Sequence, residues 1–293
     1  MGCCVLQFAE IMSNILITGC SKGIGFATSL ELARAGHRVF ATMRNPAGEP
    51  RLGEIASADK LPIEILTLDV GSDASVEACF ERIKEPIDVL VNNAGIEFHG
   101  SVEEMPMESI VAIMNTNYFG TVRCIKSVLP QMRARRSGCI INISSVGGRF
   151  STPPIGAYCA SKHAVEAISE ALAGEVKPFN IRVAIVEPGI QDTRMARAVE
   201  HGGASTYPHT RRFAGLFRAA LANPISPCVT AGVIRNIIDS GTWQLRHLSG
   251  ADAAPFVDWR AAMTDKQWIE WSAQDDESWY KAVEGDFGLN ARG

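Results

Sequence analysis

The sequence has no surplus of basic residues. Its 293 residues include 28 Lys and Arg against 32 Asp and Glu, which gives a formal net charge of -4 at pH 7. A surface that binds DNA or RNA needs clustered positive charge. The densest basic clusters, at 133–136 and 210–212, are short, and the first is typical of the cationic last turn of a helix. The composition therefore predicts no nucleic-acid partner.

Long apolar runs are also missing. No run reaches the roughly 18–20 residues that span a bilayer, and the N-terminus has no charged segment followed by an apolar one. The opening Met-Gly-Cys-Cys does not fit the myristoylation pattern, because Leu6 occupies the position that requires Ser or Thr. We therefore expect a cytoplasmic protein with no membrane span.

Metal-binding and disulfide patterns are absent as well. The eight cysteines form no CxxC pair and no even framework; they stand at positions 3, 4, 20, 79, 124, 139, 159 and 228. His99 and His163 are isolated and lack the spacing of metal ligands. We expect reduced thiols, structural histidines and no metal.

Short β-rich segments alternate with helical patterns over the first 190 residues. The expected strands cover 14–18, 38–42, 63–68, 87–92, 139–144 and 181–187, and the expected helices cover about 24–36, 73–84, 103–136 (as two helices) and 157–178. Continuous Val, Ile and Leu strands that alternate with helices are typical of a parallel sheet covered on both faces. The sequence thus predicts an α/β, doubly wound Rossmann fold, whose ligands bind outside the carboxyl ends of the strands.

The alternation ends after residue 190, but composition favours a single domain. We expect an N-terminal extension at 1–12, of which 1–11 is either non-native or dispensable because Met12 directly precedes the first strand. The catalytic unit covers 13–250, with a substrate lid at about 190–225. A helical extension of the same domain follows at 251–293.

All five tryptophans lie in the last quarter of the chain. Thr264 and Gln267 form a T-x-x-Q capping box that predicts a helix, with Trp268 and Trp271 on one of its faces. Packing onto the main unit or onto a partner subunit is the favoured interpretation of these tryptophans. Lining of the substrate cleft stays open as an alternative.

A glycine-rich turn, "TGCSKGIG" at 18–25, follows the first expected strand and opens a helix. Gly19, Gly23 and Gly25 would provide a tight turn, a close backbone approach to a pyrophosphate and close packing of the helix. A glycine-rich turn alone is a weak signal, but its position between a strand and a helix predicts a dinucleotide site.

A tyrosine and a lysine stand four residues apart in "YCASK" at 158–162. In a helix, Tyr158 and Lys162 lie on the same face, and a nearby cation lowers the pKa of a phenol. A tyrosine tuned in this way can act as a general acid or base. For the pair in isolation, an amphipathic helix residue beside a solvated lysine is the simpler interpretation.

Five motifs in order resemble the short-chain dehydrogenase/reductase family. They are the GxxxGxG turn at 18–25, "NNAG" at 92–95, "ISS" at 143–145, the Tyr-Lys pair and "PGIQDT" at 188–193. The segment "ATMRNP" at 41–46 and the long C-terminal extension resemble the branch that contains 17β-hydroxysteroid and retinol dehydrogenase-like enzymes.

The resemblance implies four catalytic residues. Tyr158 would be the acid/base, Lys162 would lower its pKa and hold the ribose, and Ser145 would bind the substrate oxygen. Asn117, in "NTNYFG", matches the family asparagine that anchors a water in the proton relay. Ser144 is the alternative to Ser145, but the family's interval to the tyrosine selects Ser145.

The end of the second strand indicates which nicotinamide cofactor binds. NAD-preferring relatives carry an acidic residue there, which holds the ribose 2'-hydroxyl. Here the position is Thr42, followed by Met43 and Arg44. Arg44 and Lys22 would bind a 2'-phosphate, with Thr42 or Ser21 adding hydrogen bonds; the alternative is that both cations are merely solvated. The expected cofactor is NADP(H).

The resemblance extends to the rest of the cofactor and substrate sites. The residues assigned to the cofactor are Gly19, Ser21, Lys22, Gly23, Ile24, Gly25, Thr42, Arg44, Asp69, Val70, Asn93, Ala94, Gly95, Tyr158, Lys162, Pro188, Gly189, Ile190 and Thr193. The residues assigned to the substrate are Ser145, Val146, Gly147, Phe150 and Met195.

The apolar lid composition predicts a cleft for a lipophilic or aromatic ketone, aldehyde or alcohol. We therefore expect an NADP(H)-dependent oxidoreductase. A 3-oxoacyl thioester reductase and a non-enzymatic NADP(H)-binding regulator remain as alternatives. Family habit implies a homodimer or homotetramer formed through helices at 115–136 and 157–178.

Overall fold

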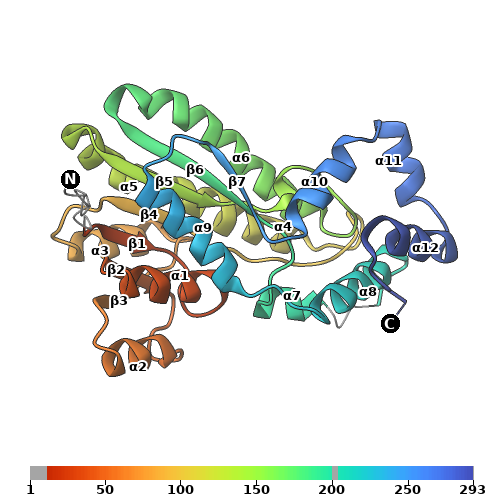
Figure 1. Cartoon of the computed structure of the whole chain (residues 1–293), viewed down its shortest axis with the longest axis horizontal. Coiled ribbons are helices and arrows are strands. Elements are labelled where there is room, and N and C mark those ends of the chain that lie inside the picture. Colours follow the sequence, from red (N-terminus) through yellow and green to blue (C-terminus); the bar gives the residue numbers. More distant parts are fainter. Residues whose placement is uncertain (1–11, 200–203, 293) are drawn as a thin grey trace, which may run out of the picture.

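A seven-stranded, wholly parallel sheet forms the centre of the molecule (Figure 1). The computed structural model describes residues 12–199 and 204–292, so the segment 1–11 expected to be non-native or dispensable lies outside the described residues. The sheet order is β3-β2-β1-β4-β5-β6-β7. The strands are β1 (Asn14–Ile17), β2 (Arg38–Met43), β3 (Ile63–Thr67), β4 (Val89–Asn92), β5 (Gly138–Ile143), β6 (Ile181–Pro188) and β7 (Arg246–Ser249).

Helices cover both faces of this sheet. One face packs against α1 (Gly23–Arg34) and α9 (Pro227–Ser240), and the other packs against α3 (Asp73–Arg82), α5 (Gly120–Arg135) and α6 (Gly156–Val176). The predicted doubly wound α/β fold is thereby confirmed.

Strand β1 is apolar on both faces because its two faces enter different cores. Ile15 and Ile17 of β1 pack into the core under α1 and α9, whereas Leu16 packs into the core under α3, α5 and α6. All three side chains are fully buried. Complete burial of a side chain of this size is worth about 1.5–3 kcal/mol.

The strand order reverses direction next to β1, which pairs with β2 on one side and with β4 on the other. The loops that leave the carboxyl ends of β1 and β4 therefore run to opposite faces of the sheet. In doubly wound folds a ligand crevice opens at such a point.

The helices between β2 and β5 depart from the prediction. Helix α2 (Arg51–Ala58) was not expected. The helical stretch expected at 103–136 begins only after Pro106 and comprises α4 (Met107–Met114), a π-helical turn η1 (Asn115–Phe119) and α5. A π-helical turn is rare and often marks a functional site.

Five helices gather at the carboxyl end of the sheet (Figure 1). They are α7 (Arg194–Val199), α8 (His209–Leu221), α10 (Ala253–Ala261), α11 (Asp265–Ser272) and α12 (Asp276–Phe287). The predicted capping box at the start of α11 is present, because the Thr264 side chain accepts from Gln267 N and the Gln267 side chain accepts from Thr264 N.

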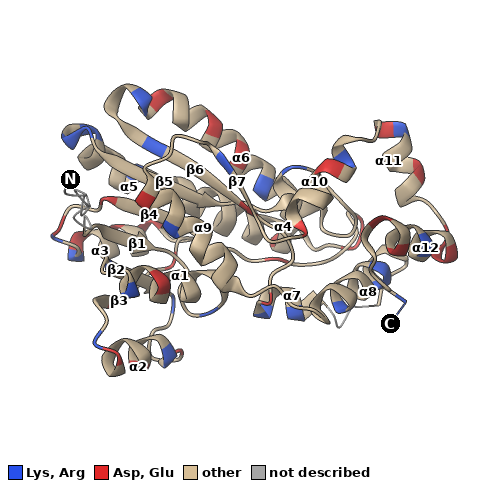
Figure 2. Ribbon diagram, in the orientation of Figure 1, with Lys and Arg blue, Asp and Glu red and all other residues tan. Residues whose placement is uncertain are grey.

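The surface matches the sequence composition. Figure 2 shows charges of both signs interspersed along outward-facing helices such as α6 and α11. Within residues 12–199 and 204–292, no helix is long and apolar enough to cross a membrane.

Candidate active site

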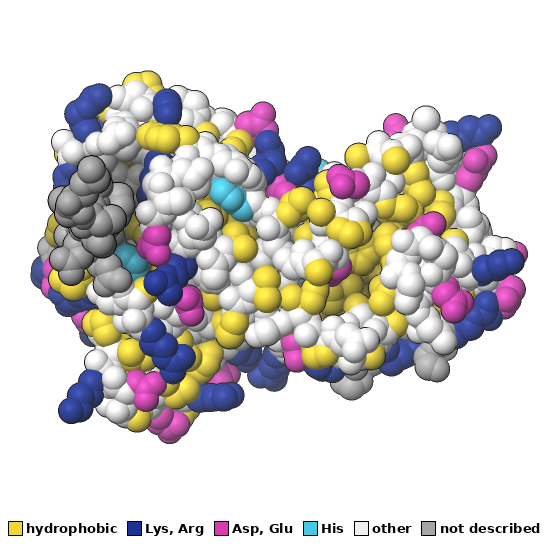
Figure 3. Space-filling view, in the orientation of Figure 1, with side chains coloured by type: hydrophobic (Ala, Val, Ile, Leu, Met, Phe, Trp, Pro, Cys, Tyr) yellow, Lys and Arg dark blue, Asp and Glu magenta, His cyan; other side chains and the backbone are white. Residues whose placement is uncertain are grey.

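A cavity of about 830 Å³ runs along the carboxyl edge of the sheet, from the glycine turn after β1 to the C-terminal helices. In Figure 3, hydrophobic side chains gather in the hollowed region beside α11 and α12. The predicted cofactor and substrate residues line this cavity, with the exceptions of Gly25 and Thr42. Of the four predicted catalytic residues, Asn117 does not line it.

The glycine turn is held against the loop after β4. Gly19 has a φ of +75°, and a Cβ placed there would lie 2.8 Å from Ala94 Cα, so a larger residue would be strained. The Thr18 hydroxyl accepts from the backbone N–H groups of Asn93 and Ala94. The Asn93 amide donates to the carbonyl oxygens of Thr18 and Gly19.

This tight junction leaves the backbone at the start of α1 open to the cavity. Gly23, with a φ of +62°, and Ile24 both line it at the N-terminus of that helix. A helix N-terminus reached by bare glycine backbone is suited to a pyrophosphate. The residues present therefore fit a dinucleotide.

Thr42 does not have the predicted role. Strand β2 continues to Met43, so Thr42 lies inside the sheet, where it is fully buried and its hydroxyl donates to Ile17 O at 3.0 Å. The prediction was wrong because it ended the strand one residue early. Arg44, the first residue after β2, lines the cavity together with Met43.

Lys22 and Ser21 also line the cavity, but the Lys22 ammonium lies 3.2 Å from the Glu49 carboxylate. The pair is solvent-exposed, so it contributes little to stability. It does reduce the positive charge that Lys22 presents to the cavity, which leaves Arg44 as the better candidate for a 2'-phosphate.

The remaining cofactor residues lie on loops that are hydrogen-bonded to the rest of the fold. Asp69 Oδ1 accepts from Gly71 N after β3, and the Asp252 carboxylate accepts from Ile190 N after β6. The Thr193 hydroxyl accepts from Ala196 N at the start of α7. These contacts hold the cavity wall in one shape.

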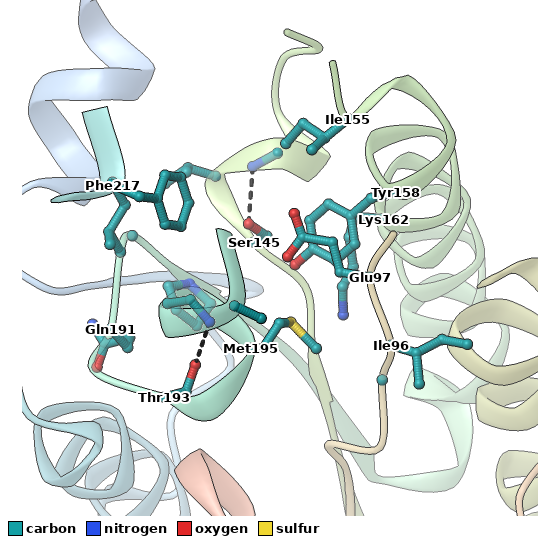
Figure 4. A pocket seen from close by; sticks show the side chains of 18 of the residues that line it. Ile96, Glu97, Ser145, Ile155, Tyr158, Lys162, Gln191, Thr193, Met195 and Phe217 are labelled. Atoms are coloured by element: carbon teal, nitrogen blue, oxygen red, sulfur yellow. Dashed lines mark hydrogen bonds between the residues drawn. The ribbon is translucent and has the colours of Figure 1, made fainter. Parts of the chain in front are cut away.

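The reaction centre lies where α6 meets the end of β5. Ser145 caps the short helix η2 (Val146–Gly148), its hydroxyl accepting from Gly147 N at 3.1 Å. Tyr158 and Lys162 come from the first turns of α6, and the Lys162 ammonium donates to Ile143 O at 2.8 Å. Figure 4 shows Ser145, Tyr158 and Lys162 along one wall of the cavity.

Asn117 lies behind this wall, in the π-helical turn, and its side-chain amide is fully engaged. Its Oδ1 accepts from Ile96 N, and its Nδ2 donates to Ile96 O and to the Ser161 hydroxyl. The π-helical geometry thus points Asn117 at the loop after β4, whose backbone it holds.

The electrostatics of Tyr158 differ from the prediction. Burial raises the pKa of the phenol above its ordinary value, the Glu97 carboxylate raises it further, and a hydrogen bond with Ser145 opposes the rise. Burial lowers the pKa of the Lys162 ammonium to about 8. The predicted lowering of the Tyr158 pKa by Lys162 is therefore not found; loss of hydration is the largest influence on the phenol. At neutral pH Tyr158 carries its proton.

Glu97 and His99 are site residues that the sequence reasoning missed. Glu97 lines the cavity with a side chain that is only 7% exposed, and His99 Nε2 lies 2.9 Å from Glu97 Oε1. A carboxylate two residues after the "NNAG" motif was the available signal. The sequence predicts His99 only as a structural residue without the spacing of a metal ligand.

Aromatic side chains form the far end of the cavity. Trp259, Trp268, Trp271 and Trp279 line it, together with Phe150. They also pack on one another: Trp268 stacks on Trp271 at 5.7 Å, and Phe150 meets Trp268 edge-on at 6.5 Å. These four tryptophans therefore pack together and also line the cavity. Trp243 lies apart, under the Lys177 ammonium.

Three features of the fold and site occur together: a parallel sheet, a glycine turn suited to a dinucleotide where the strand order reverses, and a cavity wall of Ser, Tyr and Lys side chains. Together they define a class of nicotinamide-dependent oxidoreductases. The family model for short chain dehydrogenases matches residues 13–203. The chain belongs to this family, which binds a nicotinamide cofactor.

Curated relatives confirm the predicted resemblance to the 17β-hydroxysteroid and retinol dehydrogenase-like branch. A 3-ketodihydrosphingosine reductase from Bacteroides thetaiotaomicron is 45% identical over 178 residues, which cover 60% of this chain and 62% of the relative. The chain thus matches less than two thirds of that protein. Retinol dehydrogenase 8 from Bos taurus is 35% identical over 266 residues, or 85% of each chain.

Among solved structures, a short-chain dehydrogenase from Streptomyces avermitilis is 33% identical. It superimposes with a TM-score of 0.76 and covers 90% of this chain and 97% of its own. The similarity therefore covers most of the chain.

Proposed function

We propose that the protein is an NADP(H)-dependent oxidoreductase that interconverts a lipophilic or aromatic ketone or aldehyde and its alcohol. One observation carries the proposal: the Ser145, Tyr158 and Lys162 side chains form one wall of a cavity whose far end is aromatic. The names of the relatives, 3-ketodihydrosphingosine reductase and retinol dehydrogenase 8, support a reaction of this kind.

In the reducing direction, a nicotinamide cofactor held at the glycine turn would supply the hydride that the carbonyl carbon accepts. Tyr158 and Ser145 donate hydrogen bonds to the carbonyl oxygen, on which negative charge develops. The Tyr158 proton then moves to that oxygen, which completes the alcohol and leaves a phenolate. The Lys162 ammonium, held at the Ile143 carbonyl, stabilises this phenolate until it regains a proton.

The choice of NADP(H) rests on Arg44. It lines the cavity at the end of β2, and no carboxylate stands at that strand end to accept a ribose 2'-hydroxyl or to repel a 2'-phosphate. Arginine is well suited to phosphate because it can donate two parallel hydrogen bonds.

We further propose a cytoplasmic homodimer or homotetramer. The six described cysteines are free, which is typical of a reducing compartment. Met107, Val111 and Phe119 are exposed apolar side chains on the α4 to η1 segment that precedes α5. A subunit interface along α5 and α6 would cover them.

The proposal is tested by NADPH and NADH oxidation against lipophilic ketones, with Tyr158→Phe beside the wild type. We expect NADPH-dependent reduction that falls by roughly 10²–10⁴-fold in the variant, because the proton donor is lost. NADPH affinity should change little.

The same panel separates the alternatives. Turnover confined to acyl thioesters would favour a 3-oxoacyl thioester reductase. Tight NADPH binding with no turnover on any ketone or thioester would favour a regulator, and wild-type activity in Tyr158→Phe would refute the assigned role of Tyr158.

A further inference from the structure

A carboxylate stands beside the proton donor in the reaction centre. Figure 4 shows Glu97 pointing into the cavity next to Tyr158 and Lys162. Its side chain is only 7% exposed, and its charge acts on both of these neighbours, since it raises the pKa values of both. Nothing in the proposed hydride and proton transfer uses this group.

The position of Glu97 is strongly constrained. The preceding residue, Ile96, is held through both its N–H and its carbonyl by the Asn117 side chain. The loop is held again at Gly100, whose N–H donates to Pro154 O. His99 Nε2 lies 2.9 Å from Glu97 Oε1, and the His99 ring packs on Phe213 with 5.9 Å between the ring centroids. The carboxylate is therefore built into the site.

The placement is unfavourable for a simple ketone. Reduction develops negative charge on the carbonyl oxygen, and a carboxylate nearby in a dry cavity opposes that charge. A buried carboxylate is normally retained only where it is paired. The Lys162 ammonium is held by Ile143 O, and His99 contacts only Oε1 of the Glu97 carboxylate. A positive group on the substrate would pair with the Glu97 carboxylate and so offset its repulsion of the negative charge on the carbonyl oxygen.

We propose that Glu97, oriented by His99, binds an ammonium group that the substrate carries on the carbon next to its reacting carbonyl. The inference rests on the proposed function and narrows its substrate class to lipophilic vicinal amino ketones and amino alcohols. The ammonium pairs with Glu97 while the carbonyl oxygen meets Tyr158 and Ser145. The apolar remainder of the substrate extends to the tryptophans. The reaction itself is unchanged: hydride to carbon and the Tyr158 proton to oxygen.

The test compares three medium-chain alcohols in the oxidising direction with NADP⁺: a vicinal amino alcohol, the corresponding vicinal diol and the simple secondary alcohol. The wild type is compared with Glu97→Gln, which keeps the shape and removes the charge. Glu108→Gln, at an exposed position in α4, is the matched control. We expect the wild type to prefer the amino alcohol by at least roughly tenfold in kcat/KM.

Glu97→Gln should lower kcat/KM for the amino alcohol by roughly 10–100-fold relative to kcat/KM for the simple alcohol, so that the preference for the amine is lost. Equal losses on all three alcohols, or a wild-type preference for the diol equal to that for the amine, would overturn the inference. Should Glu97→Gln not fold, the wild type alone decides, because N-acetylation of the amine removes its charge and should abolish the preference.

Binding separates this inference from the proposed function. Calorimetry with NADP⁺ present should show tighter binding of the amino alcohol than of the simple alcohol, whether or not turnover follows. Amine-dependent binding without turnover would refute the proposed function and support the ammonium site. Turnover that does not depend on the amine would support the proposed function and refute the ammonium site.

Discussion

The two sides of the cavity are built from different parts of the chain. On the cofactor side, the surface is mainly backbone: glycines and loop residues that directly follow β1, β4 and β6. On the substrate side, it is side chains: tryptophans and phenylalanines from α8, α10, α11 and α12. The cofactor side is a product of short motifs next to strands, whereas the substrate side exists only when distant helices pack together.

This difference predicts how each side responds to mutation. A backbone site should be sensitive to an added Cβ and should affect cofactor binding. An aromatic side-chain site should be sensitive to truncation and should affect lipophilic substrates. Four changes test the comparison.

Trp279→Ala should have the largest effect on the substrate side. Trp279 is 6% exposed and packs against Trp271 and Tyr280, so its truncation should cost about 3 kcal/mol in the free energy of unfolding. The KM for a lipophilic substrate should rise while the Kd for NADPH stays the same. Trp243→Ala is the control, because Trp243 is 44% exposed and lies outside the cavity. Equal destabilisation by the two changes, in urea unfolding, would contradict a packed aromatic wall.

Gly19→Ala should be the strongest single change on the cofactor side. The new Cβ would lie 2.8 Å from Ala94 Cα at a φ of +75°, which costs about 1–3 kcal/mol. NADPH binding, measured by fluorescence titration, should weaken at least roughly tenfold. Gly36→Ala provides the control: its φ is +91°, but nothing lies within 4 Å of the added Cβ. If both variants bound NADPH like the wild type, the turn would not be the pyrophosphate site.

Arg44→Asp should change cofactor preference without affecting the substrate side. Replacing the cation by a carboxylate should lower the NADP/NAD ratio of kcat/KM by roughly 10–100-fold. Arg82→Asp, at an exposed position in α3, should leave the ratio unchanged. An unaltered ratio in Arg44→Asp would show that the 2'-phosphate is held elsewhere.

Lys162 lies where the two sides meet and should give the smallest effect, a dependence of stability on pH. Burial lowers its pKa to about 8 in the folded chain, whereas an unfolded lysine titrates near ~10.4. Between these values the unfolded chain binds more protons, so stability should rise with pH from about 8 towards 10, by about 1–2 kcal/mol. Below pH 8 both states are protonated and the contribution is flat.

Urea unfolding near pH 7 and near pH 9.5 measures this rise. Lys162→Met should remove it, and Lys126→Met, at an exposed position of α5, should keep it. A rise of the same size in Lys162→Met would assign it to another group.

The sheet and most of the cofactor side were predictable because their signals are local. Strands such as β5 and β6 are short segments rich in Ile and Val, and the glycine turn lies within a few residues of β1. The errors came where neighbouring elements decide the outcome. Thr42 was assigned to the cofactor, but pairing with β3 extends β2 past it and buries its hydroxyl. Likewise, the pKa of Tyr158 is governed by burial among other elements and not by the lysine one turn away.

By itself, the sequence determined the order of the first six strands and of most helices between them, the glycine turn and the shared helical face of Tyr158 and Lys162. Each of these depends on residues within one strand or one or two helical turns, where backbone geometry sets the spacing. Only the tertiary structure decided that Glu97 reaches Tyr158 and that the tryptophans line the cavity. Contacts between residues far apart in the chain produce no periodic pattern in the sequence, because such contacts arise only when loops and helices pack together.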